Sequence, residues 1–213
     1  MKILLLGPLW RNEPIKQFLL SKGNEVVTTE GTIDLDFTRS NRIELIISSG
    51  YAPIIKEPVV KEYPHKIINL HATYLPYGKG IGTTFFSVFE GTPTGISIHF
   101  IDSGIDTGDV LFRKAVCYSK YDTLRSMHRK LLVELEQLFY EKWDDIALER
   151  YDVNPQETYT VKVPYRSRVD SERFMDLLPQ RWDTPLTQIE ELGADFLMGE
   201  EFWDRYERDM ALL

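Results

Sequence analysis

Cysteine is nearly absent from the sequence, since Cys117 is the only one in 213 residues. A single thiol can form neither an internal disulfide nor a zinc site built from several cysteines, which favours a reducing, cytoplasmic environment. Cys117 falls in a segment with the pattern of a strand. We expect it to be a small buried hydrophobic side chain.

Long apolar segments and an excess of positive charge are also missing. No run approaches the roughly 18 apolar residues of a membrane-spanning helix, and the first run, Met1–Gly7, is short for a signal peptide. Lys and Arg total 25 against 33 Asp and Glu, a net charge of −8, which disfavours a large nucleic-acid-binding surface. We expect a cytoplasmic protein that binds neither membranes nor nucleic acid.

Strand-like and helix-like segments alternate near the N-terminus. Lys2–Leu6, Glu25–Thr28 and Leu45–Ser48 have the pattern of strands, and Pro14–Lys22 has that of a helix. This order predicts an α/β fold with a Rossmann-like, mostly parallel twisted sheet flanked by helices. The first turn, Gly7–Trp10, lacks the Gly-x-Gly-x-x-Gly fingerprint, so a dinucleotide is not expected there.

Three more strands and a long helix follow, over Lys66–Leu70, Gly95–Ile101, Asp109–Cys117 and Thr123–Trp143. With 43% hydrophobic residues, the chain can bury one substantial core and a small appendage. We predict a main domain over residues 1–150 and a C-terminal extension over 151–213, where prolines recur among short strand-like and helical pieces such as Thr158–Val163 and Thr184–Leu192.

Three aromatic residues of this extension, Phe202, Trp203 and Tyr206, have helical spacing. Such a stripe favours docking onto the core or onto a second subunit over a ligand site. A homodimer is therefore a hypothesis.

Polar groups suited to acyl transfer gather between residues 68 and 108. Asn69 and His71 lie two apart on a predicted strand, so their side chains leave the same face. Asp106 lies in a glycine-rich turn just after the strand Gly95–Ile101. An amide, an imidazole and a carboxylate at one sheet edge can polarise a carbonyl group and move a proton.

An isolated Asn or His at a strand end is more often a satisfied turn residue than a catalyst. The surrounding motifs favour function. They are Ile68-Asn69-Leu70-His71, Tyr74-Leu75-Pro76, Gly95-Ile96-Ser97-Ile98-His99 and Asp106-Thr107-Gly108-Asp109. This series, including the seven-residue interval from His99 to Asp106, resembles the folate-dependent formyltransferase family, and the resemblance covers about residues 1–140.

Within that family, the segments Leu75–Gly80 and Thr92–Gly95 are most similar to short formyltransferases of nucleotide-linked amino sugars and to the formylation domains of nonribosomal peptide synthetases. Those relatives usually follow the Lys/Arg-Gly pair with Pro and Trp, where this chain has Thr83 or Thr84 and Phe86.

The resemblance implies transfer of a formyl group from N10-formyltetrahydrofolate to the primary amine of a nucleotide-linked amino sugar, through a tetrahedral intermediate and without a metal. Such a reaction would serve the synthesis of lipopolysaccharide or another surface glycan. Asn69 and protonated His71 are candidates to stabilise the negative oxygen, and Asp106 is the candidate proton carrier. His99 is expected to be a buried hydrogen-bonded support for Asp106.

By the same resemblance, Tyr51, Ile54, Gly104, Ile105 and Gly108 line the folate pocket. Core packing explains Tyr51 and Ile54 equally well, and a plain turn would use the same glycines.

The acceptor is assigned to Tyr77, Lys79 and Arg11. Lys79 lies between two glycines of an expected mobile loop, and Arg11, Arg166 and Arg168 carry guanidinium groups that match phosphate oxygens. Each of these cations also has a plainer interpretation as solvated surface charge.

Three other functions stay open. The same residues could hydrolyse formyltetrahydrofolate with water, could formylate another amine such as glycinamide ribonucleotide or an aminoacyl carrier, or could belong to a non-catalytic module that binds folate or sugar nucleotides.

Overall fold

The computed structural model describes residues 1–158 and 165–196. These residues form two compact units. The first comprises Met1–His71, Ile98–Phe112 and Glu136–Val153, and the described part of the second comprises Ala72–Ser97, Arg113–Leu135 and residues from Asn154 on. The predicted boundary at residue 150 stays a prediction. The aromatic stripe from Phe202 to Tyr206, and most of the piece Thr158–Val163, lie outside the described residues.

A six-stranded sheet has the order β2-β1-β3-β4-β6-β7. Its strands are β1 (Lys2–Leu6), β2 (Glu25–Thr29), β3 (Leu45–Ser49), β4 (Ile67–His71), β6 (Gly95–Phe100) and β7 (Val110–Ala115). The first four are mutually parallel and the whole sheet is mixed, which confirms the predicted Rossmann-like α/β fold. Chain order reverses between β1 and β3, and such switch points of α/β sheets carry ligands at the carboxyl ends of the strands.

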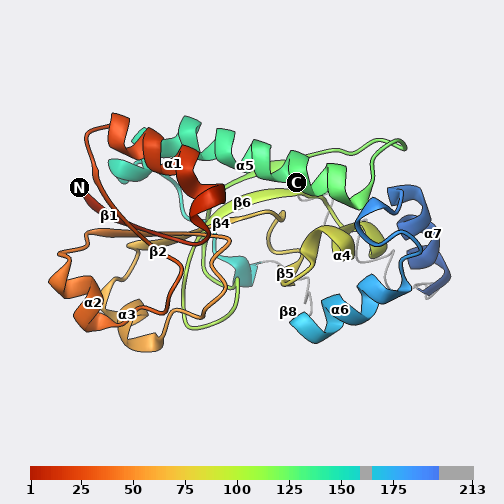
Figure 1. The fold of residues 1–213 in the computed structure, drawn as a ribbon, viewed down its shortest axis with the longest axis horizontal. Coiled ribbons are helices and arrows are strands. Elements are labelled where there is room, and N and C mark those ends of the chain that lie inside the picture. Colours follow the sequence, from red (N-terminus) through yellow and green to blue (C-terminus); the bar gives the residue numbers. More distant parts are fainter. Residues whose placement is uncertain (159–164, 197–213) are drawn as a thin grey trace. The chain divides into compact units, whose positions relative to one another are not determined.

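Helices cover both faces of the sheet in the first unit. Helix α1 (Leu9–Ser21) lies on one face, and α2 (Leu35–Ser40) and α3 (Glu57–Glu62) lie on the other (Figure 1). On the α1 side, the ring of Phe18 packs 4.4 Å from that of Tyr140 in α5 (Leu124–Ala147).

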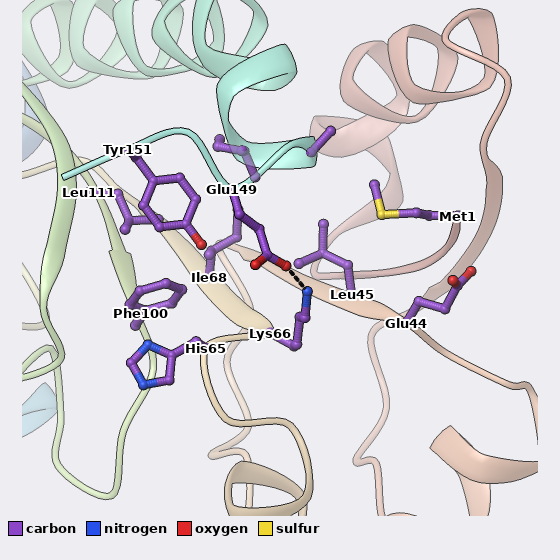
Figure 2. A pocket seen from close by; sticks show the side chains of 12 residues that line it. Met1, Glu44, Leu45, His65, Lys66, Ile68, Phe100, Leu111, Glu149 and Tyr151 are labelled. Carbon is purple, nitrogen blue, oxygen red and sulfur yellow. Dashed lines mark hydrogen bonds and ion pairs between the residues drawn. The ribbon is translucent and has the colours of Figure 1, made fainter. Parts of the chain in front are cut away.

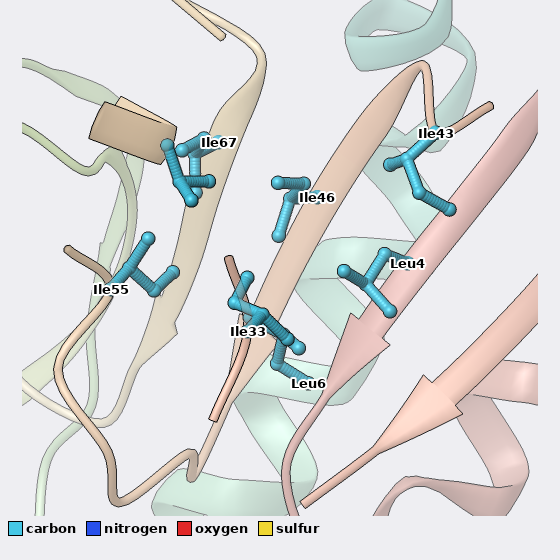
Figure 3. Packing of buried hydrophobic residues seen from close by; sticks show 8 residues of the cluster. Leu4, Leu6, Ile33, Ile43, Ile46, Ile55 and Ile67 are labelled. Atoms are coloured by element: carbon cyan, nitrogen blue, oxygen red, sulfur yellow. The ribbon is translucent and has the colours of Figure 1, made fainter. Parts of the chain in front are cut away.

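The opposite side holds a buried aliphatic cluster (Figure 3). Leu4 and Leu6 of β1 point into it because side chains two apart on a strand share a face. Ile46 of β3 and Ile67 of β4 continue the cluster across the sheet. Burying one such side chain contributes about 1.5–3 kcal/mol to the stability of the fold, so this cluster stabilises the arrangement of β1, β3 and β4.

The second unit is built around α4 (Thr83–Phe89), which is buried along its whole length. Three phenylalanines of α4 meet Phe174 of α6 (Arg168–Leu177) at ring distances of 5.1–5.5 Å. Helix α7 (Leu186–Phe196) also packs on α4. The short strands β5 (Lys79–Gly80) and β8 (Tyr165–Arg166) pair in parallel. Two single turns of 3-10 helix, Gln156–Thr158 and Arg181–Asp183, complete the elements of the described chain.

Three local predictions are wrong. Helix α1 begins at Leu9 instead of Pro14, because Pro8 occupies the N-cap position and Pro14 is accommodated inside the helix. Strand β7 ends at Ala115, which leaves Cys117 exposed. Lys79 lies in a paired strand instead of a mobile loop.

No helix in the described ranges is both long enough and apolar enough to cross a membrane.

Candidate active site

The predicted catalytic residues converge within the first unit. Asn69 and His71 leave the carboxyl end of β4, and Asp106 lies in the turn between β6 and β7. The Asp106 carboxylate is 3.4 Å from Nδ2 of Asn69 and 3.7 Å from Nε2 of His71. The second distance is too long for a direct hydrogen bond but is within the range of an ion pair. The structure thus brings the amide, the imidazole and the carboxylate together.

His99 joins this group from β6 and is 1% exposed. Its Nδ1 lies 2.7 Å from the carbonyl oxygen of Phe100, which only accepts hydrogen bonds, so Nδ1 carries a proton. In the neutral ring Nε2 is then an acceptor, and the Nδ2 amide of Asn69 donates to it over 3.1 Å. His99 was expected to support Asp106. Its short hydrogen bond goes to Asn69, and its nearest approach to Asp106 is 3.6 Å.

The turn that holds Asp106 is organised by a residue that the sequence interpretation missed. Oδ1 of Asp102 accepts hydrogen bonds from the backbone N–H of Gly104 at 3.0 Å and from the hydroxyl of Thr107 at 2.6 Å. Asp two residues before Gly is typical of an Asx-turn, and this signal could have identified Asp102. Asp106 adopts a positive φ of 52°, which this turn imposes.

Gly104 and Gly108 are required by the turn itself. A Cβ added to Gly104 would lie 2.0 Å from the Thr107 hydroxyl, and one added to Gly108 would lie 2.1 Å from the carbonyl oxygen of Phe100. The turn therefore explains both glycines without a ligand. A contact between them and a folate ring stays a prediction.

The other predicted folate contacts differ in exposure. Tyr51 packs on the aliphatic cluster and its hydroxyl donates to the carbonyl of Gly31, while burial raises its pKa. The side chains of Ile54 and Ile105 are 76% and 41% exposed. Core packing accounts for Tyr51 but not for the two isoleucines, whose apolar surfaces face outward.

Arg11 lies at the same edge of the sheet as Asn69. Its guanidinium group rests on Gly50, where a Cβ would lie 2.4 Å from Nη1. Gly50 directly follows β3, and Ser48 of β3 is in register with Asn69 of β4. Burial lowers the pKa of Arg11, but a guanidinium group keeps its charge in proteins.

Two predicted acceptor residues lie in the second unit. Tyr77 is 3% exposed and forms part of that unit's core. Lys79 is in β5, opposite Tyr165 of β8. Arg166 is engaged within the second unit, where its side chain pairs with Glu90 and stacks 4.7 Å from the ring of Phe86. Arg166 therefore has a structural role, and a phosphate contact by it stays a prediction.

A separate hollow lies at the opposite edge of the first unit's sheet (Figure 2). Leu45 begins β3, Lys66 precedes β4, and both line it together with Tyr151. An ion pair between Lys66 and Glu149 crosses it. Since α/β folds bind ligands at the carboxyl ends of their strands, the chemistry is assigned to the other edge.

The family model described as formyl transferase matches residues 24–142. The phosphoribosylglycinamide formyltransferase of Bacillus subtilis is 33% identical over 103 residues, covering 48% of this chain and 52% of that protein. A methionyl-tRNA formyltransferase of Agathobacter rectalis is 27% identical over 191 residues, covering 87% and 59%. The chain thus spans about half the length of these curated relatives.

Solved structures are similar over most of the chain. The formyltransferase PseJ from Anoxybacillus kamchatkensis, solved with UDP-4,6-dideoxy-4-formamido-L-AltNAc and tetrahydrofolate, has a TM-score of 0.83 and 36% identity, covering 90% of this chain and 100% of that one. A sugar N-formyltransferase from Shewanella shares the fold, with a TM-score of 0.70 at 19% identity, covering 91% and 87%. With its family match over more than half of the sequence, this chain belongs to the formyl transferase family.

Proposed function

We propose that this protein transfers a formyl group from N10-formyltetrahydrofolate to the primary amine of a nucleotide-linked amino sugar. The observation that carries the proposal is that Asn69, His71 and Asp106 lie together at one edge of the sheet. The Asp106 carboxylate is 3.4 Å from Nδ2 of Asn69 and 3.7 Å from Nε2 of His71. The likeness to PseJ, solved with a UDP-linked formamido sugar and tetrahydrofolate, supports the choice of both substrates.

The three side chains match the charges that the reaction creates. The amine nitrogen attacks the formyl carbon, and the bond between the formyl carbon and N10 of the folate then breaks. During the reaction the amine loses a proton and N10 gains one. The oxygen of the tetrahedral intermediate is negative, and one preorganised donor to it contributes roughly 3 kcal/mol. Asn69 and protonated His71 are assigned to this oxygen, and Asp106 carries the proton.

The NH₂ group of Asn69 has two hydrogens that can be donated. Nδ2 donates to Nε2 of His99 over 3.1 Å and makes a longer contact of 3.4 Å to an oxygen of Asp106. The longer contact is the weaker one, so its hydrogen is the one available to the developing oxyanion. His99 thereby orients the amide without contacting the substrate.

The formyl donor needs an apolar surface for its flat ring. Ile54 and Ile105 offer exposed apolar side chains in the unit that contains Asp106, and Ile105 is its immediate neighbour in the chain. Residues of this type fit a pterin ring. We assign these two isoleucines to the donor, with Tyr51, Gly104 and Gly108 shaping the surface around them.

Arg11 is our candidate for the acceptor's phosphates because it lies at the switch point between β1 and β3, one strand from Asn69. Tyr77 and Lys79 are the acceptor candidates of the second unit. The net charge of −8 favours a small anionic acceptor over a tRNA.

The test is to incubate the protein with N10-formyltetrahydrofolate and each of several acceptors, and to follow tetrahydrofolate release together with the acceptor's mass. We expect one formyl group to appear on a UDP-linked or related amino sugar. The same assay is run with glycinamide ribonucleotide, with methionyl-tRNA and without any acceptor, to test the alternative reactions. Tetrahydrofolate release without any acceptor would indicate hydrolysis and would overturn the proposal.

A further inference from the structure

Two imidazoles and one carboxylate face one another in the first unit. Nε2 of His71 and Nε2 of His99 lie 3.7 Å and 3.6 Å from the two oxygens of Asp106, and one ligand atom from each residue falls within 4.8 Å of the others. Imidazole nitrogen with carboxylate oxygen is a ligand set that binds transition-metal ions in proteins.

We propose that His71, His99 and Asp106 form a binding site for a divalent transition-metal ion such as Zn²⁺, and that the bound ion inhibits the enzyme. The sequence alone suggested no metal, and the proposed reaction needs none. The ion is therefore an inhibitor that occupies the catalytic groups.

The hydrogen bond of His99 to the backbone supports this assignment. Because Nδ1–H donates to the Phe100 carbonyl over 2.7 Å, the lone pair of Nε2 faces Asn69 and Asp106. Metal-binding histidines almost always donate their other ring N–H to a carbonyl or carboxylate in this way, which fixes the tautomer and the ring orientation. His99 is thus already held as a ligand would be.

A tetrahedral ion requires the three ligand atoms to contract around it. With metal–ligand bonds of about 2.0–2.1 Å, tetrahedral ligand atoms lie roughly 3.4 Å apart. The contacts of 3.6 and 3.7 Å run to different oxygens of Asp106, and one ligand atom from each residue lies within 4.8 Å of the others, so the three atoms must draw together around the ion. The side chains of His71 (12% exposed) and Asp106 (13% exposed) are both accessible in part to an ion from solvent.

Binding requires the resting site to rearrange. The Asn69 amide must release Nε2 of His99, so a neutral hydrogen bond is exchanged for a metal–nitrogen bond. Three protein ligands leave the fourth position of the ion to water, as in open zinc sites. Imidazole ligands favour Zn²⁺, Co²⁺ and Ni²⁺ over Mg²⁺ and Ca²⁺, which prefer oxygen.

Inhibition follows from the roles assigned to these residues, so this half of the inference rests on the proposed function. An ion that holds the lone pairs of Asp106 and His71 leaves neither group able to exchange a proton. It also displaces the Asn69 amide from its anchor on His99.

Metal binding is tested without reference to activity by titrating the full-length protein with Co²⁺ and recording the visible absorption of the bound ion. We expect one ion per chain, with an affinity at least 10-fold weaker in His99→Gln and in Asp106→Asn. The matched control is His65→Asn. His65 lies outside the cluster at a positive φ of 58°, a conformation that Asn tolerates well. Equal Co²⁺ binding by the natural protein and all three variants, or no binding by the natural protein, overturns the proposal.

The inhibitory role is tested by turnover with micromolar Zn²⁺, followed by EDTA. We expect loss of turnover with Zn²⁺, recovery with EDTA, and no effect of Mg²⁺ at the same concentration. Unchanged turnover in Zn²⁺, or turnover abolished by EDTA alone, overturns inhibition. A protein that binds Co²⁺ through the three residues but formylates no amine refutes the proposed function and leaves the metal site intact.

Discussion

Nδ2 of Asn69 donates a hydrogen bond to Nε2 of His99 over 3.1 Å, and this contact decides which way the Asn69 amide faces. The carbonyl of Phe100 fixes the tautomer of His99, so Nε2 accepts and Asn69 must present its NH₂ group. A backbone carbonyl thus determines, through the ring of His99, where the Asn69 amide proposed as a catalytic donor points. Four predictions test this arrangement and the fold around it.

The first prediction concerns His99 as a positioning residue. His99→Gln can place an amide oxygen near the position of Nε2 and keep an acceptor for Asn69, whereas His99→Leu removes it. We expect kcat to fall roughly 10-fold or more in His99→Leu, with the donor KM nearly unchanged, and to be partly restored in His99→Gln. Steady-state kinetics measure both. Equal losses in the two variants would contradict the orienting role, provided thermal melts show both are folded.

The second prediction concerns the charge-moving pair. Asp106→Asn and His71→Asn should each lower kcat by roughly 10²-fold or more, because each removes a group that changes charge or moves a proton in the reaction. Asp106→Asn is expected to fold, since Asn also tolerates the positive φ of 52°. His65→Asn is the control and should keep its kcat. Near-normal turnover in either site variant would show that its role is misassigned.

The third prediction concerns the turn that carries Asp106. Gly108→Ala drives a Cβ against the carbonyl oxygen of Phe100, a backbone atom that cannot move aside. The expected loss in unfolding free energy is about 1–3 kcal/mol, with a drop in kcat as Asp106 shifts. Gly31→Ala is the control, because its new Cβ meets only the Thr29 hydroxyl at 3.6 Å. Urea unfolding should find that control within about 0.5 kcal/mol of the natural protein.

The fourth prediction uses the pH dependence of Glu90. The residue is 6% exposed, and burial raises the pKa of its carboxyl group above the ordinary value of 4.5 although Arg166 opposes the shift. A raised folded-state pKa means that the folded chain holds the proton more tightly than the unfolded chain. The stability from protonated Glu90 is therefore complete below pH 4.5 and is lost as pH rises through the higher folded value.

Glu90→Gln cannot ionise, so its stability relative to the natural protein should improve as pH rises from about 4 to about 7. Urea unfolding at both pH values measures the difference. If the variant instead became relatively less stable at the higher pH, the ion pair with Arg166 would outweigh the cost of burying the carboxylate.

Local sequence pattern predicted the sheet well because its strands are short apolar runs between turn signals. The observed strands β3 and β4 differ from the predicted ranges, Leu45–Ser48 and Lys66–Leu70, by no more than one residue at either end. Prediction was poorer where tertiary contacts override local rules. Asn12 precedes the predicted start of the helix at Pro14, yet it is buried inside α1, where its amide donates to the carbonyl of Ser49 at the end of β3.

The order of amino acids on its own was enough to indicate the family, the parallel sheet and the three side chains of the candidate site, because strand periodicity and short motifs are local properties. Tertiary structure alone decided that His99 holds Asn69 and that Arg166 pairs with Glu90. Each of these is a directional contact whose partners and distances depend on how folded segments meet in space.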